Sequence, residues 1–301
     1  MRVLLLGKSG MLGSCFLKHL SGDKDFEMYA HDRDNLDLLD SEALNAVFAK
    51  VSPDFVINCA AYTAVDDCES NNDAAIELNG SAAGEIAKVC KRENATLLHF
   101  STDYVFDGES KNGYKEDDAP SPINVYGESK LLGEKLIQEN MDDYYIIRTS
   151  WLFGENGDNF VSTMLKLAKD RDHLDVVGDQ IGSPTYTQDL TMACIKRFLT
   201  PFLENVDDHH SRFFDADSNV FEKLDFGIYH LTNSESVSWF GFAEKIFELA
   251  NANISITEIT SDEFLRPAAR PKCSILKSTK SDFSMRSWED ALKSYLRLIL
   301  Q

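Results

Sequence analysis

Short apolar runs alternate with longer segments of helical periodicity through the first 150 residues, and this alternation restricts the fold more than any other feature of the chain. The apolar runs have the length and composition of buried strands, and they cover residues 3–6, 27–30, 55–58, 96–101 and 144–148. Strands that are separated by helices pair in parallel through right-handed crossovers. The sequence therefore predicts an α/β fold built on a doubly wound parallel sheet.

The helical segments between these runs carry start signals. Apolar residues recur at helical spacing over residues 12–20, and residues 72–92 are typical of a long, alanine-rich helix. Ser41 is the expected N-cap of a helix over residues 41–49. Ser121 followed by Pro122 is typical of a cap and a first helical residue, so we expect a helix from there that carries residues 126–139.

The regular alternation breaks down after Trp151. Residues 203–226 are polar, acidic and poor in periodicity, which favours a surface loop whose purpose the sequence leaves open. The run 207–210 (DDHH) inside it could bind a metal, but nothing there fixes a coordination geometry, so we interpret it as part of the loop. Regular patterns return with a strand at 227–231, a helix at 239–250 and an amphipathic helix at 288–298, which favours a smaller C-terminal α+β unit.

The charge balance argues against several classes of partner. The chain has 30 Lys and Arg against 50 Asp and Glu, a formal net charge of -20, and such a surface repels nucleic-acid backbones and anionic lipid headgroups. The first apolar run is too short for a signal peptide, and no later run reaches transmembrane length. Six cysteines without a C-x-x-C pair favour reduced thiols in a cytoplasmic protein, with neither disulfides nor zinc.

Three glycines lie between the first predicted strand and the first predicted helix. Gly7, Gly10 and Gly13 form G-x-x-G-x-x-G, which is typical of a turn that brings backbone N–H groups up to a pyrophosphate. We therefore expect a dinucleotide-binding domain over residues 1–150, followed by a mainly substrate-binding domain over 151–301 with some segments that return to the sheet. Asp32 and Arg33 follow the second strand and suit a ribose hydroxyl and a 2′-phosphate respectively, so the choice between NADH and NADPH stays open.

Tyr126 and Lys130 are four residues apart in YGESK, so both side chains project from one face of a helix. An ammonium beside a phenol stabilises the phenolate and lowers its pKa, which makes proton exchange with a carbonyl or alcohol oxygen practicable. Thr102 is expected at the carboxyl end of the fourth strand, the edge where doubly wound sheets bind ligands. A hydroxyl there can hold a substrate oxygen in line with Tyr126.

These segments together resemble the extended short-chain dehydrogenase/reductase family, and within it the dTDP-4-dehydrorhamnose reductase branch. The segments that carry the resemblance are GKSGMLG (7–13), NCAAYT (58–63), STDYVFDG (101–108), YGESK (126–130), RTSWLFG (148–154) and DQIGSPTYTQD (179–189). The likeness extends over nearly the whole chain and ends with two Arg-Pro pairs, at 266–267 and 270–271, before the terminal helix. It implies a Rossmann-like fold.

The resemblance assigns roles to individual residues. It implies Thr102, Tyr126 and Lys130 as the catalytic trio. Cofactor contacts are implied, besides the glycines and the Tyr126–Lys130 pair, at Met11, Leu12, Asp37, Leu38, Ala60, Ala61, Tyr62 and Thr63. Asp37 could equally cap the following helix. Substrate contacts are implied, besides Thr102 and Tyr126, at Asp103, Trp151, Asn159 and Gln180. Trp151 could equally be a packed aromatic residue after a strand.

One departure from the family pattern concerns metal binding. Some members carry a glutamate two residues after the third glycine, as part of a magnesium site between subunits, and this chain has Cys15 there. A neutral thiol is a poor ligand for a hard cation that prefers oxygen. We therefore expect no metal, and the sequence leaves open whether the protein is a monomer or a homodimer.

The function that the resemblance implies is reduction of the C4 ketone of a dTDP-linked 6-deoxy-4-keto-hexose by NADPH or NADH. The expected conversion is dTDP-4-dehydrorhamnose to dTDP-L-rhamnose, in deoxysugar and cell-surface polysaccharide biosynthesis, although the hexose itself stays open. A nucleotide-sugar dehydratase needs an acidic pair after the threonine, and here Tyr104 follows Asp103. An epimerase remains open, as does a non-catalytic subunit similar to the beta subunit of methionine adenosyltransferase.

Overall fold

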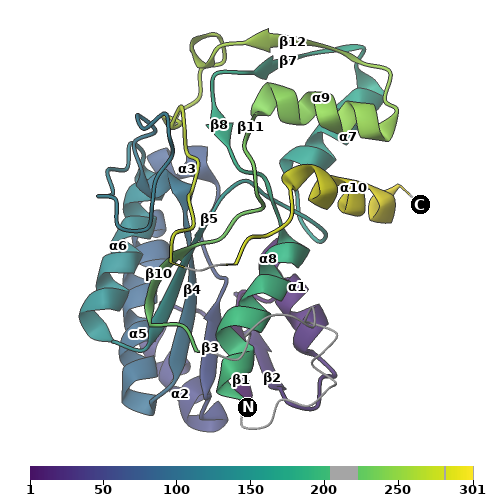
Figure 1. The fold of residues 1–301 in the computed structure, drawn as a ribbon. Coiled ribbons are helices and arrows are strands. Elements are labelled where there is room, and N and C mark those ends of the chain that lie inside the picture. The colour runs from purple at the N-terminus through teal and green to yellow at the C-terminus, as the bar shows by residue number, and fades with distance from the viewer. Residues whose placement is uncertain (204–222, 281–282, 301) are drawn as a thin grey trace.

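The computed structural model describes residues 1–203, 223–280 and 283–300. Its centre is a sheet of six parallel strands in the order β10-β5-β4-β3-β1-β2 (Figure 1). The strands are β1 (Arg2–Leu6), β2 (Glu27–His31), β3 (Phe55–Asn58), β4 (Thr96–Thr102), β5 (Tyr144–Thr149) and β10 (Gly227–His230). Every strand expected from the sequence is present, and the doubly wound α/β fold is confirmed.

Alternate side chains of the strands build two cores, one on each face of the sheet. In β1, Val3 and Leu5 face one side, and Leu4 and Leu6 face the other. The first face is covered by α1 (Met11–Leu20) and α8 (Thr187–Cys194). The second is covered by α2 (Ser41–Val51), α5 (Ala82–Glu93) and α6 (Val125–Asn140). β10 and α8 thus come from the second half of the chain and complete these layers, while the domain boundary at residue 150 stays a prediction.

Two expected helix starts are wrong. Asp40, not Ser41, caps α2, because its carboxylate accepts hydrogen bonds from the backbone N–H groups of residues 42 and 43. Asp37 does not cap this helix either; its side chain accepts from the N–H of Leu39. The helix that carries Tyr126 begins at Val125 with Asn124 as its cap, rather than at Ser121 and Pro122.

The expected helix over residues 72–92 is helical throughout but not uniform. It consists of α4 (Asn72–Ala75), a π-helical turn η1 (Ile76–Ser81) and α5. A π turn widens the helix and commonly marks a functional position. This one contains Asn79, which is buried and faces α6 through Ser129.

The second half of the chain adds a smaller unit beyond the carboxyl ends of the sheet strands, at the top of Figure 1. Its helices are α7 (Phe160–Asp170), α9 (Trp239–Ala250) and α10 (Trp288–Ile299). Its short strand pairs are β6 (Leu152–Phe153) with β9 (Thr185–Tyr186), β7 (His173–Val177) with β12 (Ser255–Ile259), and β8 (Ile181–Gly182) with β11 (Val237–Ser238). An aromatic core holds these elements together, with Phe153, Tyr186, Phe242, Trp288 and Tyr295 among its buried members.

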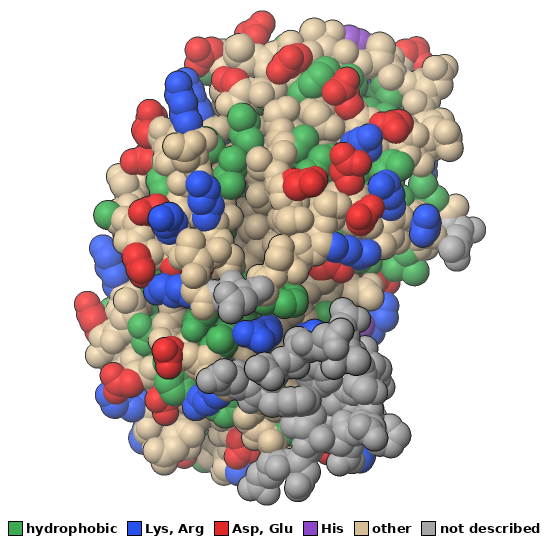
Figure 2. All heavy atoms as spheres, in the orientation of Figure 1, with side chains coloured by type: hydrophobic (Ala, Val, Ile, Leu, Met, Phe, Trp, Pro, Cys, Tyr) green, Lys and Arg blue, Asp and Glu red, His purple; other side chains and the backbone are tan. Residues whose placement is uncertain are grey.

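Part of the predicted surface loop lies outside the described residues, including the DDHH run at 207–210. Of the described ends, Leu203 and Phe226 pack against the first core. On the face of the molecule shown in Figure 2, acidic and basic side chains are interspersed. No helix within the described ranges has the length and apolarity needed to cross a membrane.

Candidate active site

The glycine turn lies at the carboxyl end of β1. In the sheet β1 lies between β2 and β3, so the chain crosses from one side of β1 to the other and the strand order reverses here. Gly7 has a φ of +84°, and a Cβ atom there would lie 2.7 Å from the Ala60 nitrogen. A Cβ atom on Gly13 would lie 2.0 Å from the Gly7 carbonyl oxygen, so this glycine lets α1 pack against the turn. A Cβ atom on Gly10 would come no closer than 3.5 Å to another atom. The turn therefore presents the backbone at Gly10 and the N-terminus of α1 to a ligand, as an anion site requires.

A cavity of about 590 Å³ opens beside this turn. Seven of the residues predicted to contact the cofactor line it, namely Gly7, Gly10, Asp37, Leu38, Ala60, Ala61 and Tyr62. The other predicted positions of the turn lie further back: Met11 contacts the segment at Gly157 and Asn159, Leu12 is in the first core, and Gly13 lies under the turn. Thr63 is exposed. The cavity has the place and lining of a dinucleotide site, and the individual contacts stay predictions.

Both charge types at the end of β2 face this cavity. His31, Asp32 and Arg33 all line it. Asp32 forms an ion pair with Lys8 at 3.9 Å, and its side chain is only 11% exposed. Arg33 is exposed.

Thr102 and Tyr126 lie together at the carboxyl end of β4. Tyr126 is in the first turn of α6, and its ring packs edge-on against Tyr104 with the centroids 5.8 Å apart. Burial raises the pKa of Tyr126 strongly, and a hydrogen bond with Thr102 offsets this only in part. Desolvation dominates the shift, and Lys130 contacts His99, so the lowering of this pKa by Lys130 stays a prediction. Tyr126 is thus a protonated acid at neutral pH.

Lys130 is buried in the next turn of α6, with its side chain against the sheet. Its Nζ lies 3.3 Å from Nε2 of His99, a residue of β4. Burial lowers the pKa of Lys130 to about 8, and burial also lowers the pKa of His99 well below its usual value. His99 is a site residue that sequence reasoning missed, although a histidine inside the apolar strand segment TLLHFST was a signal.

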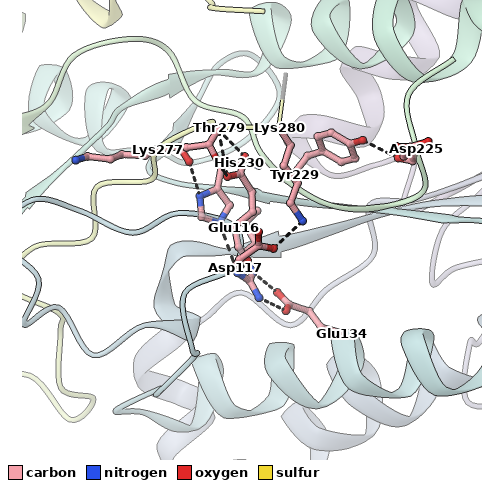
Figure 3. A network of polar contacts seen from close by, with 10 residues as sticks. Glu116, Asp117, Glu134, Asp225, Tyr229, His230, Lys277, Thr279 and Lys280 are labelled. Carbon is pink, nitrogen blue, oxygen red and sulfur yellow. Dashed lines mark hydrogen bonds and ion pairs between the residues drawn. The ribbon is translucent and has the colours of Figure 1, made fainter. Parts of the chain in front are cut away.

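A buried ion pair fixes α6 to the sheet one turn beyond Lys130 (Figure 3). Arg148 of β5 donates to Glu134 through Nε at 2.9 Å and Nη2 at 2.7 Å, and the Ser101 hydroxyl donates to the same carboxylate. The Arg148 and Glu134 side chains are 2% and 0% exposed. Tyr126, Lys130 and Glu134 follow one another at four-residue spacing, so this pair sets the position of the whole face.

Arg148 extends the network to the C-terminal segment. Its Nη1 donates to the carbonyl oxygen of Glu116 at 3.3 Å and lies 3.5 Å from Nε2 of His230. The Glu116 carboxylate accepts from the backbone and hydroxyl of Thr279. Figure 3 shows these residues between α6 and the strand that carries His230. The network therefore joins the second half of the chain to the sheet close to the site.

Asp103 lies beside Thr102, a member of the predicted catalytic trio. The Thr102 hydroxyl donates to its Oδ1 at 3.0 Å and accepts from the Tyr104 N–H at 3.2 Å. Burial raises the pKa of Asp103 to about 6. Its Oδ2 is buried and makes no hydrogen bond of good geometry with the described residues, although the Ser274 side chain lies close enough to the carboxylate to oppose the rise in its pKa. A buried acceptor left open beside Thr102 fits the prediction that this residue contacts a substrate.

The other three predicted substrate contacts have structural roles. Trp151 has a φ of +49° and stacks on Trp239 with the ring centroids 3.4 Å apart, while Gly182 closes the other side. Trp151 is thus stacked on Trp239 and closely approached by Gly182, as a packing role requires. Asn159 caps α7 and also donates to the carbonyl of Gly154. Gln180 donates to Ser261 at 2.9 Å. None of the three lines the cavity, and contact with a substrate stays a prediction.

No cluster of three or more His, Cys, Asp or Glu within the described part of the chain could hold a metal ion. Cys15, at the position where some relatives have a glutamate, is buried, and burial raises the pKa of its thiol. All six cysteines are free thiols. The absence of a metal stays a prediction.

A family model described as the RmlD substrate binding domain matches residues 1–300. The chain belongs to the RmlD family. It is an oxidoreductase of the dTDP-4-dehydrorhamnose reductase type, as the motifs indicated, and the resemblance is confirmed.

Relatives of this RmlD chain match it over nearly its full length. The spore coat polysaccharide biosynthesis protein SpsK of Bacillus subtilis (strain 168) is 38% identical, over 98% of this chain and 97% of that protein. The dTDP-4-dehydrorhamnose reductase of Aggregatibacter actinomycetemcomitans is also 38% identical, over 97% of both chains. A crystal structure of dTDP-4-dehydrorhamnose reductase from Bacillus anthracis str. Ames in complex with NADP matches with a TM-score of 0.86, at 36% identity and 99% coverage of both chains.

Proposed function

We propose that this protein reduces the C4 ketone of dTDP-4-dehydrorhamnose to give dTDP-L-rhamnose, with NADPH as the hydride donor. The observation that carries this proposal is a protonated phenol, Tyr126, beside the Thr102 hydroxyl at the carboxyl edge of the sheet. The relative from Aggregatibacter actinomycetemcomitans supports the substrate. The match to SpsK, whose name does not include this substrate, makes the hexose the part that most needs a direct test.

The residues around the cavity fit a nicotinamide dinucleotide. The Gly10 backbone is open to a pyrophosphate, α1 has no acidic residue in its first turn, and Leu36 and Leu38 give the cavity an apolar side. Such a cofactor supplies the hydride when bound, and the protein supplies placement and proton transfer.

The chain's own residues account for the proton. Tyr126 donates its phenolic proton to the substrate oxygen as that oxygen gains negative charge, and the raised pKa keeps the proton available at neutral pH. Thr102 hydrogen-bonds the same oxygen and orients it toward Tyr126. For this, the Thr102 hydroxyl must exchange its present acceptor, Asp103, for the substrate. Asp103 keeps a buried oxygen to receive a substrate hydroxyl.

The charges at the end of β2 favour NADPH. Asp32 is already paired with Lys8, whereas the exposed Arg33 lines the cavity and can bind a 2′-phosphate. We expect Arg33→Ala to raise the KM for NADPH about tenfold or more and to leave the KM for NADH nearly unchanged. Asn35→Ala, in the same loop, is the control, because it removes no positive charge. Equal effects of Arg33→Ala on the two cofactors would contradict the assignment.

The test of the function is cofactor oxidation with a panel of dTDP-linked 4-keto sugars, followed by identification of the product. Stoichiometric oxidation of NADPH with dTDP-4-dehydrorhamnose, and formation of dTDP-L-rhamnose, is the expected result. An epimerase converts the sugar without net oxidation, and a non-catalytic subunit binds cofactor without turnover. Either of these outcomes would overturn the proposed reduction. Preference for a different hexose would overturn the proposed substrate.

A further inference from the structure

His31 is the last residue of β2, and it lines the cavity beside the glycine turn. Its carbonyl oxygen accepts hydrogen bonds from the backbone N–H groups of Gly7 and Lys8 at 2.8 and 3.0 Å, which ties the residue to the turn. In doubly wound folds, the carboxyl end of the second strand recognises the 2′ position of the adenosine ribose. His31 is therefore placed where a dinucleotide presents either a 2′-hydroxyl or a 2′-phosphate.

The contact with Asn35 fixes which nitrogen of the His31 ring always carries a proton. Asn35 Oδ1 accepts from the backbone N–H of Asp32 at 3.1 Å, so the atom at this position is the amide oxygen and not the amide nitrogen. The same oxygen lies 3.1 Å from His31 Nδ1, which must therefore donate to it. His31 Nε2 forms no hydrogen bond within the described part of the chain and remains available to a ligand.

The protonation state of Nε2 decides which ribose group the ring can bind. In the neutral ring Nε2 has a lone pair, so it accepts a proton from a 2′-hydroxyl. In the imidazolium it carries a proton, so it donates to a 2′-phosphate, and the positive charge strengthens that bond. Imidazole is the side chain that most readily changes charge near neutral pH, and a single residue can therefore serve both cofactors.

The charged groups around His31 leave room for a second positive charge. Lys8, from the glycine turn, pairs with Asp32 at 3.9 Å, so these two charges offset each other and Asp32 is not a free acceptor for the ribose. The other charged groups among the described residues that line the cavity are Arg33, Asp37 and, from η1, Glu77. The two carboxylates outnumber the one guanidinium. A bound 2′-phosphate adds up to about two more negative charges, which favours the protonated ring.

We propose that His31 is a specificity-determining residue whose proton selects between the two nicotinamide cofactors. The protonated ring donates from Nε2 to the 2′-phosphate of NADPH, beside Arg33, and the neutral ring accepts from the 2′-hydroxyl of NADH. Binding of NADPH therefore takes up a proton, and the preference for NADPH grows as the pH falls. The proposal rests on the proposed function, which places a nicotinamide dinucleotide in this cavity, but it concerns binding and is tested without turnover.

The protein and the phosphate act on the pH dependence with opposite signs. A complex that holds more protons than its free components gains affinity as the pH falls. The 2′-phosphate acts the other way, because a phosphate monoester has a second pKa of about 6 and loses negative charge as the pH falls from 8 to 6. A preference for the phosphorylated cofactor that rises toward low pH must therefore come from a group of the protein that gains a proton.

Dissociation constants of NAD⁺ and NADP⁺ at pH 6 and pH 8, measured by calorimetric titration of the full-length protein, test the selection. The oxidised cofactors carry the same 2′ groups and are not consumed. In the natural protein the ratio of the NAD⁺ constant to the NADP⁺ constant should rise about tenfold from pH 8 to pH 6, as expected for one hydrogen bond to a charged group. In His31→Gln the ratio should stay constant or fall, because an amide does not titrate.

The matched control is His173→Gln, which removes an exposed histidine of β7 in the smaller unit and should keep the rise. The same pH dependence in His31→Gln as in the natural protein overturns the proposal. A loss of the rise in both variants also overturns it, because the effect is then not specific to the cavity.

Proton uptake by the natural protein tests the same claim and needs no variant. The heat of NADP⁺ binding at pH 7 is measured in two buffers that differ in ionisation enthalpy, and NAD⁺ is titrated in parallel. Net proton uptake with NADP⁺ and none with NAD⁺ is the expected result, since a phosphate bound by cations can only release a proton. Absence of uptake with NADP⁺ overturns the proposal, also if His31→Gln does not fold.

The outcomes separate this proposal from the proposed function. A protein that takes up the proton with NADP⁺ but oxidises no cofactor with any keto sugar overturns the reductase function and leaves the role of His31 standing. A protein that reduces the keto sugar but shows no proton uptake with NADP⁺ overturns the role of His31 alone. A protein that binds neither dinucleotide overturns both.

Discussion

Removal of one partner of the buried ion pair between Arg148 and Glu134 should destabilise the protein strongly, because it leaves the other charge buried and unpaired. Both side chains are nearly inaccessible, and the guanidinium donates twice to the carboxylate. Glu134→Gln keeps the size and shape of the side chain but leaves the Arg148 cation buried without a counter-charge. Removing one partner of a buried pair typically costs ~3–5 kcal/mol. This is a large part of the ~5–15 kcal/mol by which a folded protein is stable.

The measurement is urea-induced unfolding of the natural protein and the variant at pH 7, followed by circular dichroism. We expect the unfolding free energy to fall by about 3–5 kcal/mol without a change in the dependence on urea concentration. The control is Glu85→Gln, which removes an exposed ion pair with Lys88 and should change the value by less than ~1 kcal/mol. A similar, small loss in both variants would refute the reasoning.

A double variant separates the buried charge from lost packing. Glu134→Leu combined with Arg148→Met removes both charges and fills the same space with apolar atoms, so a good part of the lost stability should return. Its activity should remain low, because the position of Tyr126 and Lys130 depends on how α6 is held against β4 and β5. If the double variant is less stable than Glu134→Gln, the unpaired charge is not the cause of the loss.

Three further predictions address the site. Tyr126→Phe should lower kcat about a hundredfold or more while cofactor binding, measured by fluorescence titration, is kept; near-normal turnover would remove Tyr126 from the reaction. Asp103→Asn should stabilise the protein at pH 7 and much less at pH 4. The reason is that the pKa of Asp103 is raised to about 6 in the folded state, so ionisation of this group lowers the unfolding free energy as the pH rises from about 4 through 6. Unfolding curves at the two pH values measure this difference, and an equal effect at both would contradict it. Asn79→Ala should weaken NADPH binding about tenfold, because Asn79 hydrogen-bonds the backbone N–H and carbonyl of Tyr62, which lines the cavity, and the Ser129 hydroxyl. Unchanged affinity in a titration would show that the position of Tyr62 does not depend on Asn79.

The fold could be predicted from the sequence because burial acts on many residues at once. The inner strands β1, β3, β4 and β5 are almost wholly buried, so each shows as a largely apolar run, and the alternation with helices then dictates parallel pairing. The helix starts were harder to predict, since several capping residues stand close together. The backbone N–H of Ser121 bonds to Val105, a contact remote in sequence, and the helix begins only after Asn124.

The candidate site was predicted in part. Thr102, Tyr126 and Lys130 belong to short motifs with a recognisable spacing, whereas the partners of Lys130 do not. Asn58 and His99 are 41 residues apart, and His99 and Lys130 are 31 residues apart. Their contacts exist only because β3, β4 and α6 lie next to one another in the fold. The raised pKa of Tyr126 is likewise a result of burial, which no local pattern reveals.

Transfer of a labelled hydride tests the central claim most directly. The protein is incubated with dTDP-4-dehydrorhamnose and NADPH that carries deuterium at the transferred position of the nicotinamide, and the product is analysed by proton NMR. The account predicts dTDP-L-rhamnose with deuterium at C4 from the natural protein and almost no product from Tyr126→Phe. Label at another carbon, a product without label, or equal yields from the two proteins would contradict it.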